Sequence, residues 1–95
     1  MKIELVRINE SNKAVLRQLM ELYLYDFSEF DHEDVNEHGV YGYRYLDHYW
    51  TEAGRHPFFI QVDDQLAGFV LIRRLTPPDE TPVIMAISEF FVMRK

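Results

Sequence analysis

The sequence contains no cysteine, which excludes disulfides, thiolate metal ligands and cysteine nucleophiles together. Long apolar runs are also missing, whereas a membrane helix needs about 20 consecutive apolar residues. The first residues, Met1 to Glu4, do not begin the apolar stretch of a signal peptide. We therefore expect a cytoplasmic location and no membrane partner.

Basic residues and glycines are few. Lys and Arg total 10 against 16 Asp and Glu, and the net charge of -6 opposes binding to nucleic acid or to an anionic membrane surface. The four glycines, at positions 39, 42, 54 and 68, are scattered, so no glycine-rich phosphate loop is present. The acidity by itself is explained by solubility, and a cationic partner is the alternative.

Motifs for a serine nucleophile or a metal are lacking as well. No serine lies in a G-x-S-x-G elbow. The acidic segment after position 30 holds hard ligands, but Asn36 stands where a zinc helix beginning at His32 needs its second histidine. Val35 stands where a calcium loop beginning at Asp31 needs an oxygen ligand. We therefore expect no metal site.

Apolar residues make up 47% of the 95 residues, enough for one domain with a hydrophobic core. Alternation predicts a first strand at Lys2–Ile8. The apolar spacing then predicts a helix from Asn12 to about Phe30, with Ser11 as its N-cap. An acidic loop follows to Gly42.

A second helix is predicted at Tyr43–Ala53, because apolar residues recur at positions 46, 49, 50 and 53 and Gly54 is placed to end it. Strands Phe58–Val62 and Leu66–Arg74, around a short polar turn, form a predicted hairpin. A proline-rich loop at 76–82 precedes a last strand, Val83–Met93.

The resulting order, β-α-α-β-β-β, predicts an α/β fold of the α+β type. Its antiparallel four-stranded sheet has the order 1-2-3-4, with both helices on one face. Two apolar runs, Phe58–Ile60 and Phe69–Ile72, are continuous rather than alternating, as in strands that are covered on both faces. We infer that the sheet needs a second covering layer, which these residues do not contain.

The segments Gly68–Leu71 and Glu89–Val92, with this element order over essentially the whole chain, resemble the GNAT superfamily of acyl-CoA-dependent N-acyltransferases. The segments 26–30 and 39–43 are similar to a bacterial subgroup whose acceptor is generally unassigned. The resemblance implies an N-acetyltransferase that moves the acetyl group of acetyl-CoA to an amine of a small molecule or protein.

In that family the fourth strand ends in a bulge, and its backbone binds acetyl-CoA. The resemblance implies that a backbone N–H at Phe90 or Phe91 polarises the thioester carbonyl. It implies cofactor contacts at Phe91, Val92 and Met93, with Val92 pairing with the pantetheine arm. Glu89 would act as base, directly or through water. Ordinary β-core packing is the alternative for the apolar residues, and the two are compatible because the functional role concerns the backbone.

The two helices of the family border the acceptor site. Substrate contacts are therefore implied for Phe27, Asp31, Glu33, Asp34 and Tyr41. The acidic segment would favour a cationic amine, polyamine-like or aminoglycoside-like. A merely solvated acidic loop is the alternative.

Family members continue into an Arg/Gln-x-x-Gly-x-Gly/Ala loop at a helix N-terminus, which binds the pyrophosphate. The sequence stops at Lys95. We therefore expect residues 1–95 to be the N-terminal portion of one domain, truncated before that loop, with weak or no binding of acetyl-CoA. A non-catalytic half-domain that dimerises or binds a partner is the alternative. We also expect self-association through the edge strand Val83–Met93, sensitive to a charge at Phe91.

Overall fold

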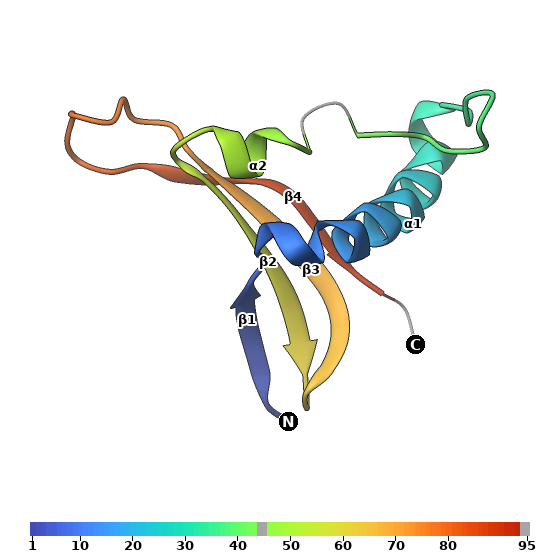
Figure 1. Ribbon diagram of the computed structural model, residues 1–95, viewed down its shortest axis with the longest axis horizontal. Helices are drawn as coiled ribbons and strands as arrows, with labels where there is room; N and C mark the ends of the chain where they lie inside the picture. Colours follow the sequence, from blue (N-terminus) through green and yellow to red (C-terminus); the bar gives the residue numbers. More distant parts are fainter. Residues whose placement is uncertain (44–45, 94–95) are drawn as a thin grey trace.

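A four-stranded sheet and one long helix dominate the fold, in a computed structural model that describes residues 1–43 and 46–93 (Figure 1). In chain order the elements are β1 (Ile3–Arg7), a short 3-10 helix η1 (Glu10–Asn12), α1 (Lys13–Asp31), α2 (His48–Thr51), β2 (Arg55–Val62), β3 (Gln65–Arg74) and β4 (Met85–Val92). The segment 32–43 that follows α1 turns back from the end of the helix towards the side of the molecule that carries α2 (Figure 1).

The sheet has the predicted order β1-β2-β3-β4, and every neighbouring pair is antiparallel. The β2–β3 hairpin closes through Asp63 and Asp64, whose φ angles of 51° and 68° are those of a two-residue turn that matches the twist of its strands. The strand bounds differ from prediction by one residue at each end of β1 and at the start of β3, and by more in the other two strands. β2 begins earlier, at Arg55, and β4 is shorter at both ends than Val83–Met93.

Helix α1 confirms the predicted helix, but not the predicted cap. The helix buries Leu16, Leu19 and Met20, whereas other apolar positions on it are exposed, namely Val15, Leu22, Phe27 and Phe30. Ser11 lies inside η1, and the residue before α1 is Asn12, which makes no side-chain cap. Because η1 already forms a turn ahead of α1, the chain enters the helix without a serine cap. The expectation for Ser11 was wrong.

The second helix is much shorter than Tyr43–Ala53, since only the single turn of α2 is helical. Just before and within it, backbone bonds of the i to i+3 type run from Leu46 N to Tyr43 O and from Tyr49 N to Leu46 O. This tighter winding still buries Leu46 and Tyr49. The apolar spacing therefore predicted burial correctly and helix length wrongly. Residues 44 and 45, within the predicted helix, lie outside the described residues.

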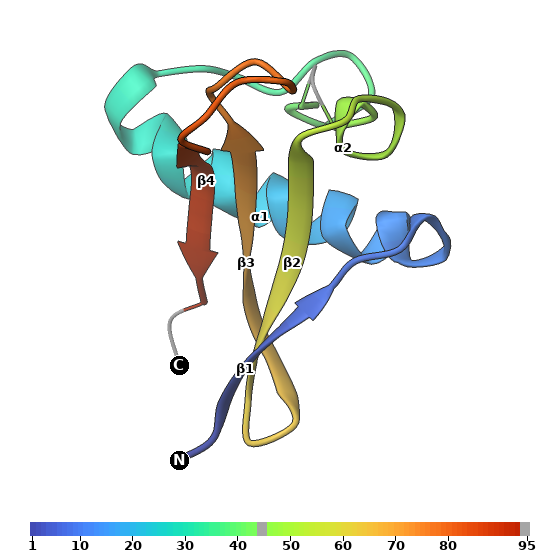
Figure 2. The ribbon, with the colours of Figure 1, turned by 90° about the vertical axis from the view of Figure 1, so that its left-hand side faces the viewer.

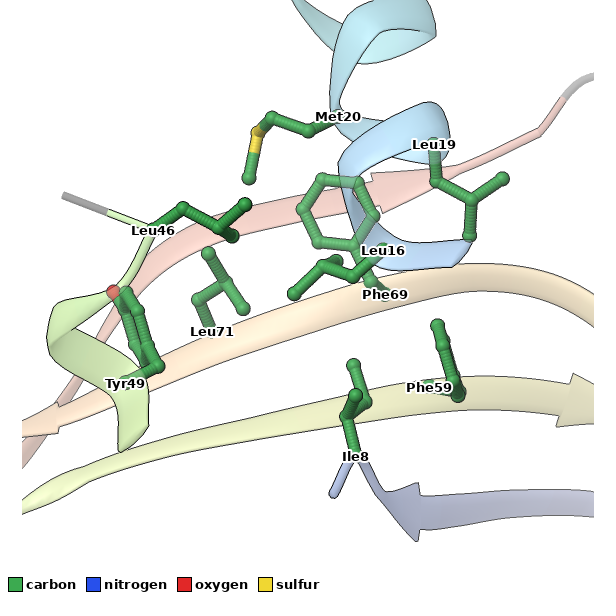
Figure 3. Packing of buried hydrophobic residues seen from close by; sticks show 9 residues of the cluster. All are labelled: Ile8, Leu16, Leu19, Met20, Leu46, Tyr49, Phe59, Phe69 and Leu71. Atoms are coloured by element: carbon green, nitrogen blue, oxygen red, sulfur yellow. The ribbon is translucent and has the colours of Figure 1, made fainter. Parts of the chain in front are cut away.

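The core lies on one face of the sheet, where α1 and α2 both pack (Figure 3). Its nine buried members are Ile8, Leu16, Leu19, Met20, Leu46, Tyr49, Phe59, Phe69 and Leu71. Phe59 and Phe69 are directly opposite one another on β2 and β3, so their side chains share this face. The prediction that both helical segments cover the same face is confirmed.

The opposite face of the sheet is apolar and open in the described chain. Figure 2 shows α1 crossing behind the strands. Directly opposed residues share a face, and the register places one apolar set on the side away from α1. Its exposed members are Ile3, Leu5, Met85, Ile87, Phe90 and Val92. Phe91 packs on the helix side instead, so Phe90, not Phe91, tests this open face.

Gly68 lets β4 approach β3 closely. A Cβ atom at Gly68 would lie 1.9 Å from the carbonyl oxygen of Phe91. We expect Gly68→Ala to lower the free energy of unfolding by about 1–3 kcal/mol or more, because backbone and not a flexible side chain must move. Urea unfolding measures this. Gly42→Ala is the control. Alanine at its φ of 72° should lower the free energy of unfolding by about 1 kcal/mol, but the added Cβ would meet no atom within 4 Å. Equal losses in the two variants would contradict the close approach.

The open face also predicts association. Isolated residues 1–95 should form dimers or larger assemblies at about 10–100 µM, since an apolar sheet face and the free edge of β4 are both exposed. Phe90→Glu should restore a monomer in size exclusion with light scattering. Leu22→Glu, at a position 51% exposed on α1, is the matched control and should leave the assembly intact. A monomeric wild-type chain over that range would refute the expectation.

Candidate functional site on strand β4

A bulge in β4 turns Glu89 towards the helices. Leu71 pairs with Glu89, but the next residue, Ile72, pairs with Ile87, so Ser88 is an extra residue on β4. A bulge of this kind moves the side chains of the residues that follow it to the other face of the sheet. As a result Glu89 faces α1, whereas Ile87 stays on the open face.

The Glu89 carboxylate is held by two tyrosine hydroxyls from different segments. Tyr23, on α1, donates to Oε2, and Tyr43, in the segment before α2, donates to Oε1 at 3.4 Å. Burial first, then the hydrogen bond and the charge of Glu89, raise the pKa of Tyr23 above its ordinary value. Burial, followed by the neighbouring Tyr49 and Glu89, raises the pKa of Tyr43. Both tyrosines therefore stay protonated donors at neutral pH.

Along β4, some backbone N–H groups point to β3 and the others point to the free edge of the sheet. The Met93 N–H donates to the Ala67 carbonyl at 2.8 Å, and the Phe91 carbonyl lies against Gly68. Both groups therefore point to β3. Since successive residues of a strand alternate in direction, the N–H groups of Phe90 and Val92 point to the free edge. Two outward-pointing donors thus follow Glu89 along the edge of the sheet.

Besides a cleft of about 530 Å³ at the end of this strand, by Val92 and Met93, two clefts flank its middle. One, of about 570 Å³, is lined by Tyr43, Arg55, Arg73, Ile87, Ser88 and Glu89. The other, of about 250 Å³, is lined by Tyr23, Asp26, Phe27, Phe30, Phe90, Phe91 and Val92. The second cleft brings the predicted substrate residue Phe27 next to Phe91 and Val92, two of the three predicted cofactor residues. The rings of Phe27 and Phe91 lie 6.0 and 5.8 Å from that of Tyr23.

The acidic loop is not brought to these clefts. Asp31, Glu33 and Asp34 are exposed and line neither cleft, and the Asp31 carboxylate accepts the Glu33 N–H at 2.9 Å within the loop. Tyr41 lines neither cleft as well, and its backbone N–H is bound by Glu21. The predicted role of these four residues stays a prediction.

The carboxylate of Glu21 anchors the loop to α1. Its two oxygens accept the consecutive backbone N–H groups of Tyr41 and Gly42 at 2.6 and 2.9 Å. This fixes the chain just before Tyr43, which donates to Glu89. Glu21 therefore acts on the site through the backbone.

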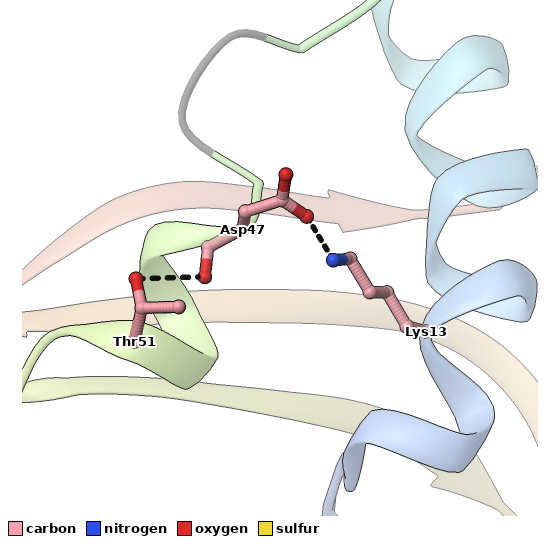
Figure 4. A network of polar contacts seen from close by, with 3 residues as sticks. All are labelled: Lys13, Asp47 and Thr51. Atoms are coloured by element: carbon pink, nitrogen blue, oxygen red, sulfur yellow. Dashed lines mark hydrogen bonds and ion pairs between the residues drawn. The ribbon is translucent and has the colours of Figure 1, made fainter.

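An ion pair fixes the start of α1 to the other side of the site (Figure 4). Lys13 pairs with the carboxylate of Asp47, whose carbonyl accepts the Thr51 hydroxyl at 3.3 Å. The Lys13 ammonium also lies 5.3 Å from the ring of Trp50. These contacts tie the short helix α2, and with it Tyr49, to the start of α1.

Within residues 1–43 and 46–93, no group of three or more His, Asp or Glu side chains could hold a metal ion. In the same part of the chain, no helix has the length and apolarity needed to cross a membrane.

One solved structure supplies the comparison for this geometry. The chain is similar to a ribosomal-protein-alanine N-acetyltransferase from Brucella melitensis biovar Abortus 2308, with a TM-score of 0.56 and 13% identity over 97% of this chain. The chain has an N-acetyltransferase-like fold. It spans 58% of the length of that neighbour. No family model and no curated protein matches the sequence.

Sequence reasoning missed Tyr23 and Tyr43 as partners of Glu89. It placed Tyr23 within the first predicted helix and Tyr43 at the start of the second. The signal was the hydroxyl itself, because a tyrosine that enters a core needs a hydrogen-bond partner. Nothing in the spacing identified that partner, since it lies 66 positions along the chain from Tyr23.

The tyrosine pair predicts how stability depends on pH. An unfolded chain releases tyrosine protons near pH ~10, whereas Tyr23 and Tyr43 hold theirs to higher pH when folded. The unfolded state then binds fewer protons, so the free energy of unfolding should fall as pH rises above ~10 and stay unaffected below it. Glu89→Gln should lower both pKa values in a tyrosine absorbance titration. Glu4→Gln, the control on β1, should not. Titration of both tyrosines at the ordinary pH would contradict the contact.

Proposed function

We propose that the chain belongs to an acetyl-CoA-dependent N-acetyltransferase, in which it supplies the catalytic edge of the sheet. The observation that carries the proposal is the order of groups on β4. A carboxylate at Glu89 is followed by outward backbone N–H groups at Phe90 and Val92. The N-acetyltransferase-like fold supports the same activity.

Each group has a role in acyl transfer. The Phe90 N–H stabilises the oxyanion that forms on the thioester carbonyl when the amine nitrogen attacks its carbon. Glu89 accepts the proton that the amine loses, directly or through water. The N–C bond forms, the C–S bond breaks, and the thiolate leaves with the electron pair and is then protonated. Val92, with its neighbours Phe91 and Met93, lies where the pantetheine arm would pair with the strand.

The cleft that Phe27 shares with Phe91 and Val92 supports this assignment. Its apolar rings suit the pantetheine arm of acetyl-CoA. The proposal also includes a cytoplasmic location, where this donor is found, and a single domain of which residues 1–95 form the N-terminal portion. The 58% span of the neighbour is consistent with such a portion.

The acidic loop supports a weaker part of the proposal. Asp31, Glu33 and Asp34, with Tyr41 near the end of the loop, would attract a cationic amine from solution. These side chains are exposed, and exposed charges steer ligands over about 8–10 Å. Steering by the loop would appear in association rates and would weaken with salt.

A second candidate function is a non-catalytic half-domain that pairs with a second chain. The open apolar face, with Ile87 and Phe90 exposed by 63% and 56%, favours it. This candidate needs no bound acetyl-CoA and no carboxylate at Glu89. Activity of the protein that contains this chain distinguishes the two.

The decisive experiment measures acetyl transfer from acetyl-CoA to a panel of amines by thiol release. Glu89→Gln should lower kcat by about 10²–10⁴, the usual contribution of a general base, while the KM for acetyl-CoA changes little. Glu80→Gln, in the exposed loop before β4, is the control. In isothermal titration, isolated residues 1–95 should bind acetyl-CoA weakly or not at all.

Unchanged kcat in Glu89→Gln would remove Glu89 as base. Absence of transfer to every amine, together with a stable dimer, would favour the half-domain instead. Low-micromolar binding of acetyl-CoA by isolated residues 1–95 would overturn the expectation that they are insufficient for binding.

A further inference from the structure

Two arginines lie directly opposite each other on the helix side of the sheet. Arg55 on β2 pairs with Arg73 on β3. Like charges at directly opposed positions destabilise a sheet, and this chain carries a net charge of -6, so basic residues are scarce. The repulsion between the two arginines therefore lowers the stability of the fold, and an anion bound between them would offset it.

The two charges are compensated unequally. Arg55 lies 3.5 Å from Glu52 and stacks 5.5 Å from the ring of Tyr49, with 22% of its side chain exposed. Arg73 is exposed and forms no salt bridge within the described part of the chain. Neither guanidinium pairs with Glu89, although all three residues line one cleft. One positive charge in the cleft is thus left without a partner.

That cleft is the larger of the two that flank the middle of β4. Its volume of about 570 Å³ is within the range of small-molecule sites. Its wall includes Ser88, whose buried hydroxyl has no hydrogen-bond partner among the described residues. The same wall carries the Glu89 carboxylate, with two of its roughly four lone-pair sites occupied by Tyr23 and Tyr43. Acceptor and donor groups therefore face one space.

We propose that this cleft binds a small amine that also carries an anionic group, a carboxylate or a phosphate. Arg73 and Arg55 hold the anionic group, and Glu89 receives the amine. The guanidinium group suits this role because its planar fork of donors matches both anions. As a statement about the acetyl acceptor, the inference rests on the proposed function; as a statement about anion binding, it does not.

The inference names an acceptor different from the one that the acidic loop suggests. A purely cationic polyamine would place further positive charge beside Arg55 and Arg73. A zwitterionic amine satisfies both signs of charge in the cleft. Exposed loop charges act at longer range, on approach rather than in the cleft.

Inorganic phosphate is the first probe, without any acetyl-CoA. Phosphate should raise the thermal unfolding midpoint of the wild-type chain, because it binds only the folded arginine pair. In NMR titration, the side-chain N–H signals of Arg55 and Arg73 should shift together. Arg73→Gln should weaken phosphate binding about tenfold or more, as expected for loss of a charged hydrogen-bond donor.

The thermal stability of Arg73→Gln shows whether a loss of phosphate binding comes from misfolding of the variant. Without phosphate, its unfolding midpoint should match or exceed that of the wild type, because the like-charge pair is gone. The matched control is Arg7→Gln on β1, which removes the same charge on the other face and should keep wild-type phosphate affinity. Equal phosphate affinity in Arg73→Gln and wild type would overturn the anion site. A large loss of affinity in Arg7→Gln would overturn it too, by showing a net-charge effect.

Matched amines test the acceptor class in the protein that contains this chain. β-Alanine and O-phosphoethanolamine should have higher kcat/KM than propylamine and ethanolamine, and Arg73→Gln should remove that advantage. The preferred member of the first pair identifies carboxylate or phosphate. If phosphate binds but no amine is acetylated, the anion site stands and the proposed acetyltransferase activity is wrong. If propylamine and ethanolamine are the better acceptors, the acetyltransferase activity stands and the proposal of a zwitterionic acceptor is wrong.

Discussion

The extra residue Ser88 in β4 is the constraint on which the site depends. With strict alternation along β4, Glu89 would share a face with Met85 and Ile87. The inserted residue reverses this relation, so the carboxylate enters the core side and the two apolar residues stay on the open side. The contacts of Glu89 with two tyrosines, and the apolar continuity of the other face, both follow from this one irregularity.

The bulge also combines two properties that an ordinary strand keeps apart. A polar side chain facing a core is costly unless it is hydrogen-bonded, and Tyr23 and Tyr43 remove that cost for Glu89. At the same time, the N–H groups of Phe90 and Val92 point away from β3, to the free edge. Side-chain chemistry and backbone donors thus meet at consecutive positions, with the core supporting one and the free edge supplying the other.

Much of the fold followed from local pattern, because local chemistry decides it. The polar turn at Asp63 and Asp64 predicted the hairpin, and the apolar spacing correctly predicted that Leu46 and Tyr49 are buried. The length of the second helix was wrong, since that spacing also fits a tighter winding with i to i+3 bonds. The acidic loop drew attention by composition alone, and composition does not say where a loop lies.

The site depended more on register, which the sequence states poorly. Counting from the hairpin turn without irregularity would place Arg55 opposite Ile72. A bulge at Ala67 shifts the register by one residue and places Arg55 opposite Arg73. The partners of Glu89 come from α1 and from the segment before α2, and their meeting depends on tertiary packing rather than on any spacing along the chain.

The anchor made by Glu21 has a consequence for variation between homologous proteins. Its carboxylate accepts hydrogen bonds from the main-chain N–H groups of residues 41 and 42, and every residue except proline has a main-chain N–H. Side chains of the preceding loop can therefore be exchanged while the path of the chain into Tyr43 is preserved. The scaffold therefore separates an exchangeable surface from a fixed approach of the chain to Glu89.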